Sequence, residues 1–329
     1  MALATLRYDL RQPDFAKQML AERYATCLDQ CAFAEGRGVG MVVVSEHHDV
    51  DDGYLPSPLI LAGAIAARTR TMSINIGALL VPLHDPLRLA EDLAVLDLLS
   101  QGRVSAVAGL GYREEEFAMF GIDRSRRGKI LDEALDVLLL AWTGEPFEYR
   151  GRTVRVTPKP LTQPHPTLLV GGSTEVAARR AARHHLPFMP AVGDVALKEV
   201  YRAACDEAGF AGGYVLLPSG PGFVHLTDDP ERAWAQIGPF ALHEAQSYAA
   251  WQRDGQRSNV TTHATTVQEL EESGIYWVVT PDECVERAAA MRPSAALTLH
   301  PLMGGMDPQL GWESLELFVD KVLPRLRTA

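Results

Sequence analysis

The feature that most constrains the fold is a regular alternation of short apolar strands with amphipathic helices. The sequence predicts strands within ALATLRYDL (residues 2–10) and GMVVVSEHH (40–48), with a helix over 15–35 between them. The same pattern continues to a last strand within AALTLHPLMGG (295–305) and a closing helix over 312–326. Strands that are apolar along their whole length, each followed by a helix, are typical of a parallel sheet covered on both faces.

About eight such strands in 329 residues predict an α/β fold of the (β/α)8 TIM-barrel type, in a single domain spanning residues 1–329. An open, doubly wound sheet is the alternative, and it would place a glycine-rich turn between the first strand and its helix. The GRGVG segment (36–40) precedes a strand instead, which favours the barrel. The segment IYWVVTP (275–281) fits either a short strand or an extended lead into a helix.

Composition narrows the class of protein. The net charge of −11 argues against non-specific binding to nucleic acid or to an anionic membrane. Apolar runs stay well short of the ~18 residues of a membrane span, and the N-terminus lacks a signal-peptide core. With only four cysteines, a cytoplasmic protein is expected. Cys27 and Cys31 are expected to be buried thiols and no metal site is predicted, because zinc-type ligand spacings are absent.

One predicted strand ends in three chemically capable side chains, Glu46, His47 and His48. The active site of a TIM barrel lies at the carboxyl ends of its strands. Successive side chains of a strand point to opposite sides, so at most one of the two histidines faces the barrel interior. An imidazole can give or take a proton near neutral pH, which makes His47 a candidate acid or base. A buried structural histidine is the alternative, and the local sequence does not separate the two.

A second candidate is the VGGST segment (170–174), in which a strand and a glycine turn precede a helix. Backbone amides at a helix N-terminus, reached across glycines, suit a phosphate group. An ordinary N-cap by Ser173 or Thr174 is the alternative and is favoured by the local sequence alone. The segment 112–127 is expected to be a loop, either a lid with an anion clamp or a solvated connection.

Several motifs together resemble the bacterial luciferase-like flavin monooxygenases, a family that also includes oxidoreductases using the deazaflavin F420. The most specific stretch is IGALLVPLHDPLRLAEDLAVLDLLSQGRV (76–104). It is accompanied by the EHH segment, by GYREEEFAMFG (111–121), by the VGGST turn and by a C-terminal HPLMGG (300–305). The resemblance extends from about residue 1 to residue 327 and implies a luciferase-like TIM barrel that binds a flavin at its rim.

The resemblance assigns expected roles to individual positions. His47 matches the family's catalytic histidine, and Gly77 and Ala78 match a place where the family often has a non-prolyl cis peptide against the flavin ring. Luciferase has an arginine on the flavin phosphate where this chain has Leu110, so backbone amides or an arginine from 124–127 would take its place. The expected cofactor-binding residues are Gly77, Ala78, Gly109, Leu110, Gly172, Ser173 and Thr174. The expected substrate-binding residues are Tyr112, Phe188 and Met303.

The resemblance implies an enzyme that uses reduced FMN from a separate reductase, and O2, to oxygenate a small, hydrophobic organic substrate. An F420-dependent oxidoreductase that moves a hydride is the first alternative. A non-catalytic flavin-binding or partner subunit is the second, and the retained His47 and glycine-rich rim argue against it. The family commonly pairs through helices near its second and third strands, so a homodimer is expected.

Overall fold

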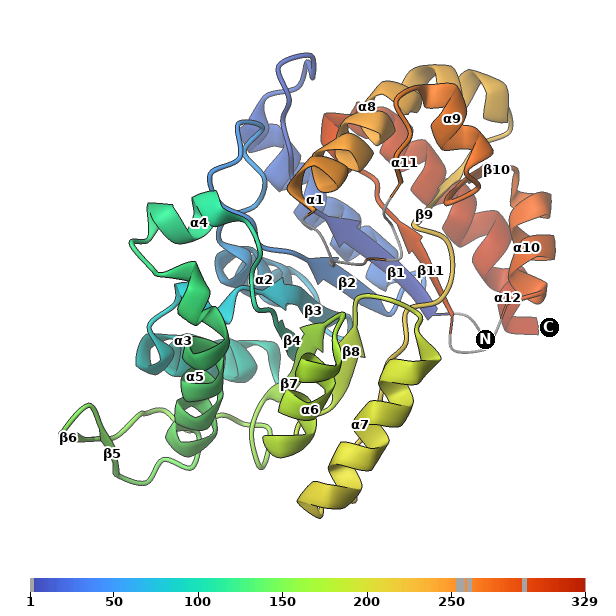
Figure 1. Cartoon of the computed structure of the whole chain (residues 1–329). Helices are drawn as coiled ribbons and strands as arrows, with labels where there is room; N and C mark the ends of the chain where they lie inside the picture. Colours follow the sequence, from blue (N-terminus) through green and yellow to red (C-terminus); the bar gives the residue numbers. More distant parts are fainter. Residues whose placement is uncertain (1–2, 253–257, 259–261, 292–294, 329) are drawn as a thin grey trace. The chain divides into compact units, whose positions relative to one another are not determined.

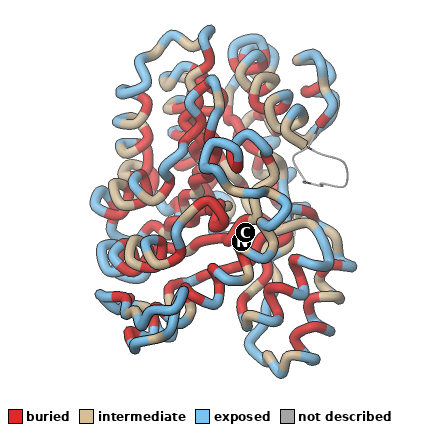
Figure 2. The backbone as a smooth tube through the Cα atoms, turned by 60° about the vertical axis from the view of Figure 1, so that its left-hand side comes forward, coloured by how far each residue is buried: buried red, intermediate tan, exposed pale blue. Residues whose placement is uncertain are grey.

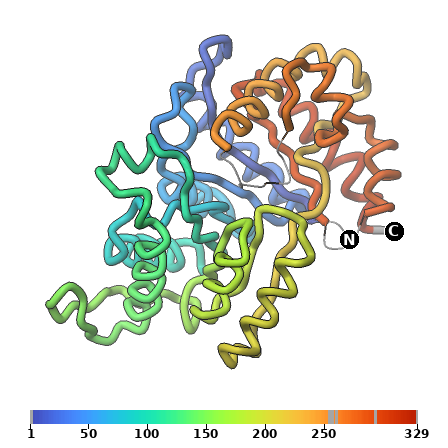
Figure 3. Tube along the Cα trace, viewed as in Figure 1, coloured from blue at the N-terminus to red at the C-terminus, as the bar shows by residue number. Residues whose placement is uncertain are grey.

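A computed structural model describes residues 3–252, 258, 262–291 and 295–328 of the chain. These residues form two compact units. The first combines Met1–Val44, Val50–Leu55 and Pro218–Ala329, so it draws on both ends of the chain, blue and red in Figure 3. The second combines Ser45–Asp49 with Pro56–Leu217. Each unit is built from parallel strands and the helices that connect them.

The first unit contains a parallel sheet in the order β10-β9-β11-β1-β2. β1 lies between β11 and β2 (Figure 1), with Leu6 opposite both Leu299 and Val42. The strands are β1 (Leu3–Tyr8), β2 (Met41–Val44), β9 (Phe223–Leu226), β10 (Tyr276–Val279) and β11 (Ala296–Leu299). The helices are α1 (Leu20–Glu35), α8 (Pro230–Trp251), α9 (Val267–Glu272), α10 (Pro281–Ala289), the 3-10 turn Met303–Gly305, α11 (Pro308–Leu317), the π-helical turn Phe318–Val322 and α12 (Leu323–Thr328).

The second unit contains a parallel sheet in the order β3-β4-β7-β8. Its helices pack in neighbouring pairs, and α6 lies beside α7 in Figure 1. The strands are β3 (Ser73–Leu79), β4 (Val104–Ala108), β7 (Thr167–Gly172) and β8 (Phe188–Pro190), with an antiparallel hairpin of β5 (Phe147–Tyr149) and β6 (Arg152–Val154). The helical elements are α2 (Pro58–Arg68), the 3-10 turn Val81–Leu83, α3 (Pro86–Ser100), α4 (Glu114–Met119), the 3-10 turn Arg124–Arg126, α5 (Arg127–Ala141), α6 (Glu175–Arg183) and α7 (Val195–Ala208).

Two residues of the most specific sequence motif (76–104) have a structural role. Asp85 caps α3 by accepting hydrogen bonds from the amides of Leu87 and Arg88. The guanidinium of Arg103 donates to the carbonyl oxygens of Ala66 and Met72, which ties the end of α2 to the start of β4. These contacts satisfy carbonyl groups that a helix end leaves without partners. The aspartate and arginine of this motif therefore stabilise the turns between strands and helices.

Burial follows the pattern expected for sheets covered by helices. Buried residues run along the strands and along one side of most helices, as Figure 2 shows in red. Strand residues such as Leu6, Val42, Ile76 and Val170 are fully buried, which explains the apolar strands of the sequence. Among the helices of the described residues, none combines the length and the apolar character needed to cross a membrane.

Three local predictions need correction or completion. The helix expected over 15–35 begins only at Leu20, because Phe15 turns away and packs its ring against Phe240, 5.3 Å between centroids. The segment expected as a loop over 112–127 contains α4, whose Glu116 and Phe117 are buried. The ambiguous segment at 275–281 contains a strand, β10, which pairs with β9.

Candidate active site

The EHH segment follows β2, and its two histidines have different partners. Nδ1 of His47 lies 2.7 Å from Oε1 of Glu116, on α4. Nε2 of His48 lies 2.9 Å from Oε1 of Glu46. All four side chains are buried. The alternation inferred from the sequence therefore separates the two imidazoles, and Glu46 shares its surroundings with His48.

The contact with Glu116 sets the tautomer of His47. An ionised carboxylate only accepts hydrogen bonds, so Nδ1 of His47 carries the proton that points to Glu116. The hydroxyl of Tyr112 lies 3.4 Å from the other ring nitrogen, Nε2, and the two rings meet edge to face with 5.6 Å between centroids. The pair therefore presents Nε2 as the atom of His47 that can exchange a proton.

Glu116 is itself held in place from several directions. Its Oε1 accepts a hydrogen bond of 3.1 Å from the backbone amide of His48 and lies 3.6 Å from Nη1 of Arg113. The same guanidinium donates to the carbonyl oxygens of His48 and Asp49. Arg113 thus joins the segment after β2 to the start of α4. This buried arginine balances the charge of Glu116 and fixes the carboxylate under His47.

Glu46 forms a separate anchor. Its carboxylate accepts hydrogen bonds from Nε2 of His48 at 2.9 Å, from Nε2 of His84 at 2.8 Å and from the amide of Leu80 at 2.6 Å. Burial alone would raise the pKa of Glu46, but the hydrogen bonds from His48 and His84 outweigh it and hold that pKa at about 2. Glu46 therefore anchors the EHH segment through His48, His84 and Leu80, whereas the carboxylate next to His47 is that of Glu116.

The ends of β3 and β4 meet closely beside this segment. The peptide bond between Gly77 and Ala78 is cis, as the family resemblance implies. Ser45 donates a hydrogen bond of 3.0 Å to the carbonyl oxygen of Gly77. A Cβ atom on Gly109 would lie 2.8 Å from Cβ of Ala78 and 3.3 Å from the carbonyl oxygen of Leu79, so only glycine fits there. Gly77 and Ala78 remain partly exposed.

The glycine turn after β7 also excludes a side chain. Gly172 has a φ of +140°, and a Cβ atom there would lie 2.6 Å from Cβ of Ala177. Thr174 caps α6, because its hydroxyl accepts a hydrogen bond of 3.3 Å from the amide of Ala177. The N-cap interpretation is therefore confirmed for Thr174. The first amides of α6 have no carbonyl partner within the helix, so they remain suitable for an anion.

A second group of donors lies at the start of α5. Nη1 of Arg127 donates to the carbonyl oxygen of Arg124 at 3.0 Å, and both side chains are half-buried. Burial and the neighbouring charge of Arg124 lower the pKa of Arg127. Within the described part of the chain, neither arginine has a carboxylate partner, and Nε of Arg127 is buried without a hydrogen bond. Arg180, in the second half of α6, reaches the carbonyl oxygen of Gly128 at 3.5 Å, so this part of α6 lies beside the start of α5.

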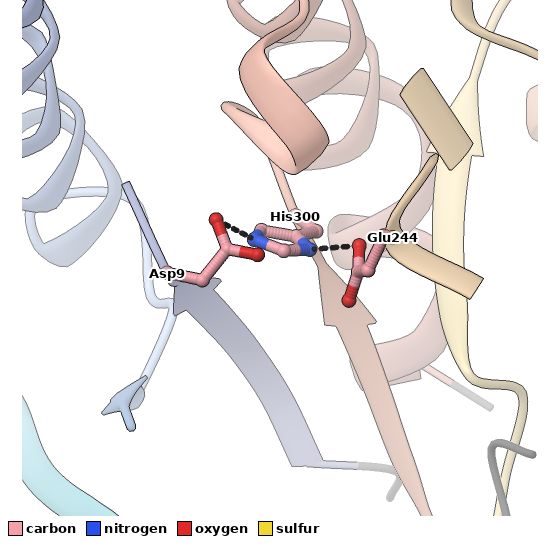
Figure 4. Close-up of side chains that lie close together, drawn as sticks. All are labelled: Asp9, Glu244 and His300. Atoms are coloured by element: carbon pink, nitrogen blue, oxygen red, sulfur yellow. Dashed lines mark ion pairs between the residues drawn. The ribbon is translucent and has the colours of Figure 1, made fainter. Parts of the chain in front are cut away.

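The first unit holds a cluster that the sequence analysis did not assemble. His300, which follows β11, lies between Asp9 after β1 and Glu244 of α8 (Figure 4). Its Nε2 is 3.5 Å from Asp9 and its Nδ1 is 3.2 Å from Glu244. One ligand atom from each residue lies within 4.8 Å of the others, which is within reach of a metal ion. The two ring nitrogens face different carboxylates, however, so the arrangement suits a protonated imidazole better than a ligand set.

Charge balance supports the protonated imidazole. Nε of Arg11 is 3.3 Å from Asp9, Nη1 of Arg11 is 2.9 Å from Asp52, and Nη1 of Arg7 is 3.5 Å from Glu244. Two arginines then face three carboxylates, and the groups that can supply the further positive charge are His300 and His243, whose Nε2 lies 2.7 Å from Asp52. Burial opposes protonation of His300, but the charges of Glu244 and Asp9 outweigh it and raise its pKa.

Comparison with known families shows which family the chain belongs to. The sequence profile described as "Luciferase-like monooxygenase" matches residues 7–298. The chain belongs to this family. A relative from Sinorhizobium fredii, the uncharacterized protein y4vJ, is 24% identical over 91% of this chain and 91% of its own length. The chain is therefore a member of a family of flavin- and F420-dependent oxidoreductases, and neither match names a substrate.

Solved structures show that the chain shares the luciferase-like TIM-barrel fold. The monooxygenase RslO1 from Streptomyces bottropensis has a TM-score of 0.78 at 23% identity and covers 99% of this chain and 100% of its own. The oxygenating constituent of 3,6-diketocamphane monooxygenase from Pseudomonas putida, in complex with FMN, has a TM-score of 0.74 at 20% identity (98% and 99% covered). An F420-dependent secondary alcohol dehydrogenase has a TM-score of 0.66 at 18% identity (99% of each chain covered).

The residues expected to contact substrate in this luciferase-like protein lie in different surroundings. Tyr112 is partly exposed and next to His47. Phe188 is fully buried and its ring stacks on Tyr201 of α7, 5.8 Å between centroids, so it belongs to the packing of sheet against helix. Met303 is also buried, in a cluster with Trp234 of α8 in the first unit. Contact of these residues with a substrate remains a prediction.

The main residue that sequence reasoning missed is Glu116. It stands in a run of three glutamates at the start of a segment expected to be a loop, and nothing in the run marks one of them as buried. The available signal is its position next to Phe117, because a helix through this segment turns Glu116 and Phe117 inward and leaves Glu114 and Glu115 exposed.

Proposed function

We propose that this luciferase-like protein is a flavin-dependent monooxygenase that uses reduced FMN, supplied by a separate reductase, to oxygenate a small, hydrophobic organic substrate. In the overall reaction, one atom of O2 is added to the substrate and the other leaves as water. The two electrons and two protons come from reduced FMN, which leaves as FMN. The family profile and the FMN complex of the diketocamphane enzyme support this choice of cofactor.

The observation that carries the proposal is the buried pair of His47 and Glu116. Glu116 fixes the ring of His47 through Nδ1, so Nε2 is oriented to give a proton to the reacting oxygen or to accept one from it. Tyr112 lies on the Nε2 side and can pass a proton onward. Burial of His47, at 6% exposure, keeps competing water away from this nitrogen.

The other residues at the strand ends fit a flavin mononucleotide. We propose that the isoalloxazine ring lies against Gly77, Ala78, Gly109 and Leu110, of which Gly77, Ala78 and Leu110 are partly exposed, while Gly109 is buried and leaves no room for a side chain. We propose that Gly172, Ser173 and the first amides of α6 hold the phosphate, beside the hydroxyl of Thr174. Arg124 and Arg127, which make no ion pair among the described residues, would supply the positive charge that Leu110 does not. When bound, the reduced flavin supplies the electrons that activate O2.

An F420-dependent oxidoreductase remains the second candidate, and the same arginines favour it. F420 carries a long anionic tail, which needs more positive charge than one phosphate does. In the second unit, Arg124 and Arg127 make no ion pair with a carboxylate among the described residues, and together with Arg126, whose charge acts on the exposed Asp123, they form a cationic segment at the start of α5. In that case His47 would assist proton transfer while a hydride moves between substrate and deazaflavin. A non-catalytic subunit is the third candidate.

We also propose that the protein works as a homodimer, following the family expectation. Size-exclusion chromatography with light scattering across a dilution series tests it. A dimer mass of about twice the chain's 36.0 kDa is expected, and a monomer mass at every concentration would contradict it.

An anaerobic binding titration decides between the cofactors. Purified protein is titrated with reduced FMN and, separately, with F420, and the dissociation constants are compared. The proposal predicts saturable binding of reduced FMN that is tighter than binding of F420. Micromolar binding of F420 without binding of FMN would overturn it in favour of hydride transfer. Arg127→Ala is expected to weaken binding of either cofactor, whereas Arg152→Ala on the exposed β5–β6 hairpin is the matched control.

A further inference from the structure

The first unit carries a groove on the helix side of β9 that the proposed function does not use. It has a volume of about 830 Å³ and lies between the start of α8 and α11 with its following π-helical turn. Its polar wall contains the residues directly after β9 and its opposite wall comes from α11. We call it the α8–α11 groove. All the residues that line it belong to one unit, so the groove is complete within that unit.

The rim of the α8–α11 groove is strongly acidic. Two basic residues, Arg232 and Lys321, face six carboxylates, which leaves an excess of four negative charges. The six acidic residues are Asp228, Asp229, Asp307, Glu313, Glu316 and Asp320. Asp229 and Asp307 cap α8 and α11, and Lys321 lies 3.9 Å from Asp228. Among the described residues, Glu316 and Asp320 have no ion pair, so their charge is available to a ligand.

The floor of the groove contains a buried imidazole. His225 is on β9, two residues after Phe223, so the two side chains lie on the same face of the sheet. Phe223 packs against Ala233 and Trp234 of α8, which places that face toward the helices. His225 is 6% exposed and lines the groove. No other described residue makes a hydrogen bond or ion pair with the imidazole, and its nitrogens are not among the fully enclosed polar atoms, so they are accessible to a ligand in the groove.

The imidazole is neutral under physiological conditions. Burial lowers the pKa of His225 to about 4, and no neighbouring charge offsets this effect. A neutral imidazole has one nitrogen that accepts a hydrogen bond and does not repel a cation. The groove therefore combines a neutral acceptor at its floor, anionic groups at its rim, and apolar side chains between them, namely those of Leu226, Ala233, Leu310 and Leu317.

We infer that the α8–α11 groove binds a linear aliphatic polyamine. The alkyl chain of such a molecule would lie on the apolar side chains, its terminal ammonium groups would pair with Glu316 and Asp320, and one N–H would donate to His225. A single metal ion fits less well. Among the described residues, the only three metal-type ligands that converge are Asp9, Glu244 and His300, which are not part of the groove. The inference is independent of the cofactor and of the oxygenation reaction.

Calorimetric titration of the full chain with spermidine tests the inference. Saturable binding with a stoichiometry of one is expected at low salt. Binding should weaken as ionic strength rises from about 0.01 M to 0.15 M, since the Debye length falls from about 30 Å to about 8 Å. A double variant, Glu316→Gln with Asp320→Asn, should bind about fivefold to tenfold more weakly, because each exposed ion pair contributes up to about 1 kcal/mol.

Two further variants make the test specific. Glu271→Gln with Glu286→Gln removes the same charge from exposed positions of the first unit outside the groove, and should change the dissociation constant less than twofold. His225→Leu keeps the charge and the approximate volume but removes the acceptor, and should weaken spermidine binding about threefold or more while the unfolding transition is retained. If His225→Leu does not fold, comparison of the two charge variants still shows whether spermidine binds in the α8–α11 groove.

Three results would overturn the inference. The first is no saturable binding of spermidine at low salt. The second is equal weakening by the groove variant and by the matched control, which would mean attraction to the net negative charge of the chain. The third is binding of Mg²⁺ that is abolished by the groove variant in a protein that does not bind spermidine.

Discussion

Oε1 of Glu116 lies 2.7 Å from Nδ1 of His47, although 69 residues separate them in the chain. The carboxylate is fully buried and is also held by the amide of His48 and by Arg113. A hydrogen bond to Nδ1 sets the tautomer of an imidazole and orients its other nitrogen. The catalytic assignment of His47 in this luciferase-like protein therefore depends on a residue of α4, the helix that the sequence did not predict.

The first prediction concerns Glu116→Gln. The substitution keeps the shape of the side chain but removes the negative charge that faces Arg113 and His47 in a buried position, so the free energy of unfolding should fall by about 1–3 kcal/mol. Urea denaturation at pH 7 measures the loss. Glu115→Gln, one residue away and exposed, should change stability by no more than about 0.5 kcal/mol. Equal effects of the two substitutions would show that Glu116 is not the buried anchor described here.

The second prediction concerns Glu46 and acid. Its pKa of about 2 in the folded protein lies below the ordinary value of 4.5. The lowered pKa contributes stability that is complete above the ordinary pKa and is lost as the pH falls through the folded value. Glu46→Gln should therefore cost about 3 kcal/mol at pH 7, and the difference from wild type should shrink between pH ~4.5 and pH ~2. A difference that stays constant over this range would contradict the hydrogen-bond arrangement around Glu46.

The third prediction concerns His300, whose contribution to stability should depend on pH in the opposite direction to that of Glu46. Its pKa is raised by Glu244 and Asp9, so its contribution to stability is complete below the ordinary value of about 6.5 and is lost as the pH rises through the folded value. His300→Gln should be most destabilising below pH ~6.5, and its deficit should decrease at higher pH. Thermal unfolding from pH 5.5 to pH 9 measures this, with the exposed His263→Gln as control. A deficit that grows with pH would mean that His300 is neutral in the folded protein.

The fourth prediction concerns Gly172→Ala. The φ of +140° disfavours any side chain, and the new Cβ would lie 2.6 Å from Cβ of Ala177, so the start of α6 must shift. Stability should fall by about 1–3 kcal/mol, and binding of reduced FMN should weaken because we propose that its phosphate lies on that turn. Gly40→Ala is the matched control, since no atom lies within 4 Å of its Cβ position. Unchanged FMN binding in a folded Gly172→Ala protein would show that the FMN phosphate does not bind at this turn.

Much of the architecture was predictable because it depends on local patterns. Continuous apolar runs fix the buried strands, and the glycine turn with Thr174 marks the start of α6. The split between His47 and His48 follows from strand alternation alone. Glu116 could not be chosen from three adjacent glutamates, because its burial depends on the phase of a helix whose apolar residues are few.

Contacts between segments that are far apart in the sequence could not be predicted either. Asp9, Glu244 and His300 belong to three elements from both ends of the chain, and each alone looks like an ordinary polar residue. Their meeting is set by the pairing of β1 with β11 and by the packing of α8, which no local pattern encodes. The start of α1 was misplaced for a related reason, because the ring of Phe15 packs on α8 instead of continuing a helix.

The most direct test of the central claim is the rate at which O2 oxidises reduced FMN bound to the protein. An anaerobic complex of protein and reduced FMN is mixed rapidly with oxygenated buffer, and flavin oxidation is followed by absorbance. We expect a time course different from that of free reduced FMN, and a change of about tenfold or more in the rate constant for His47→Ala. His165→Ala, outside the site, should behave as wild type. Identical time courses for wild type, His47→Ala and free flavin would show that His47 does not act on the reaction of bound reduced FMN with O2.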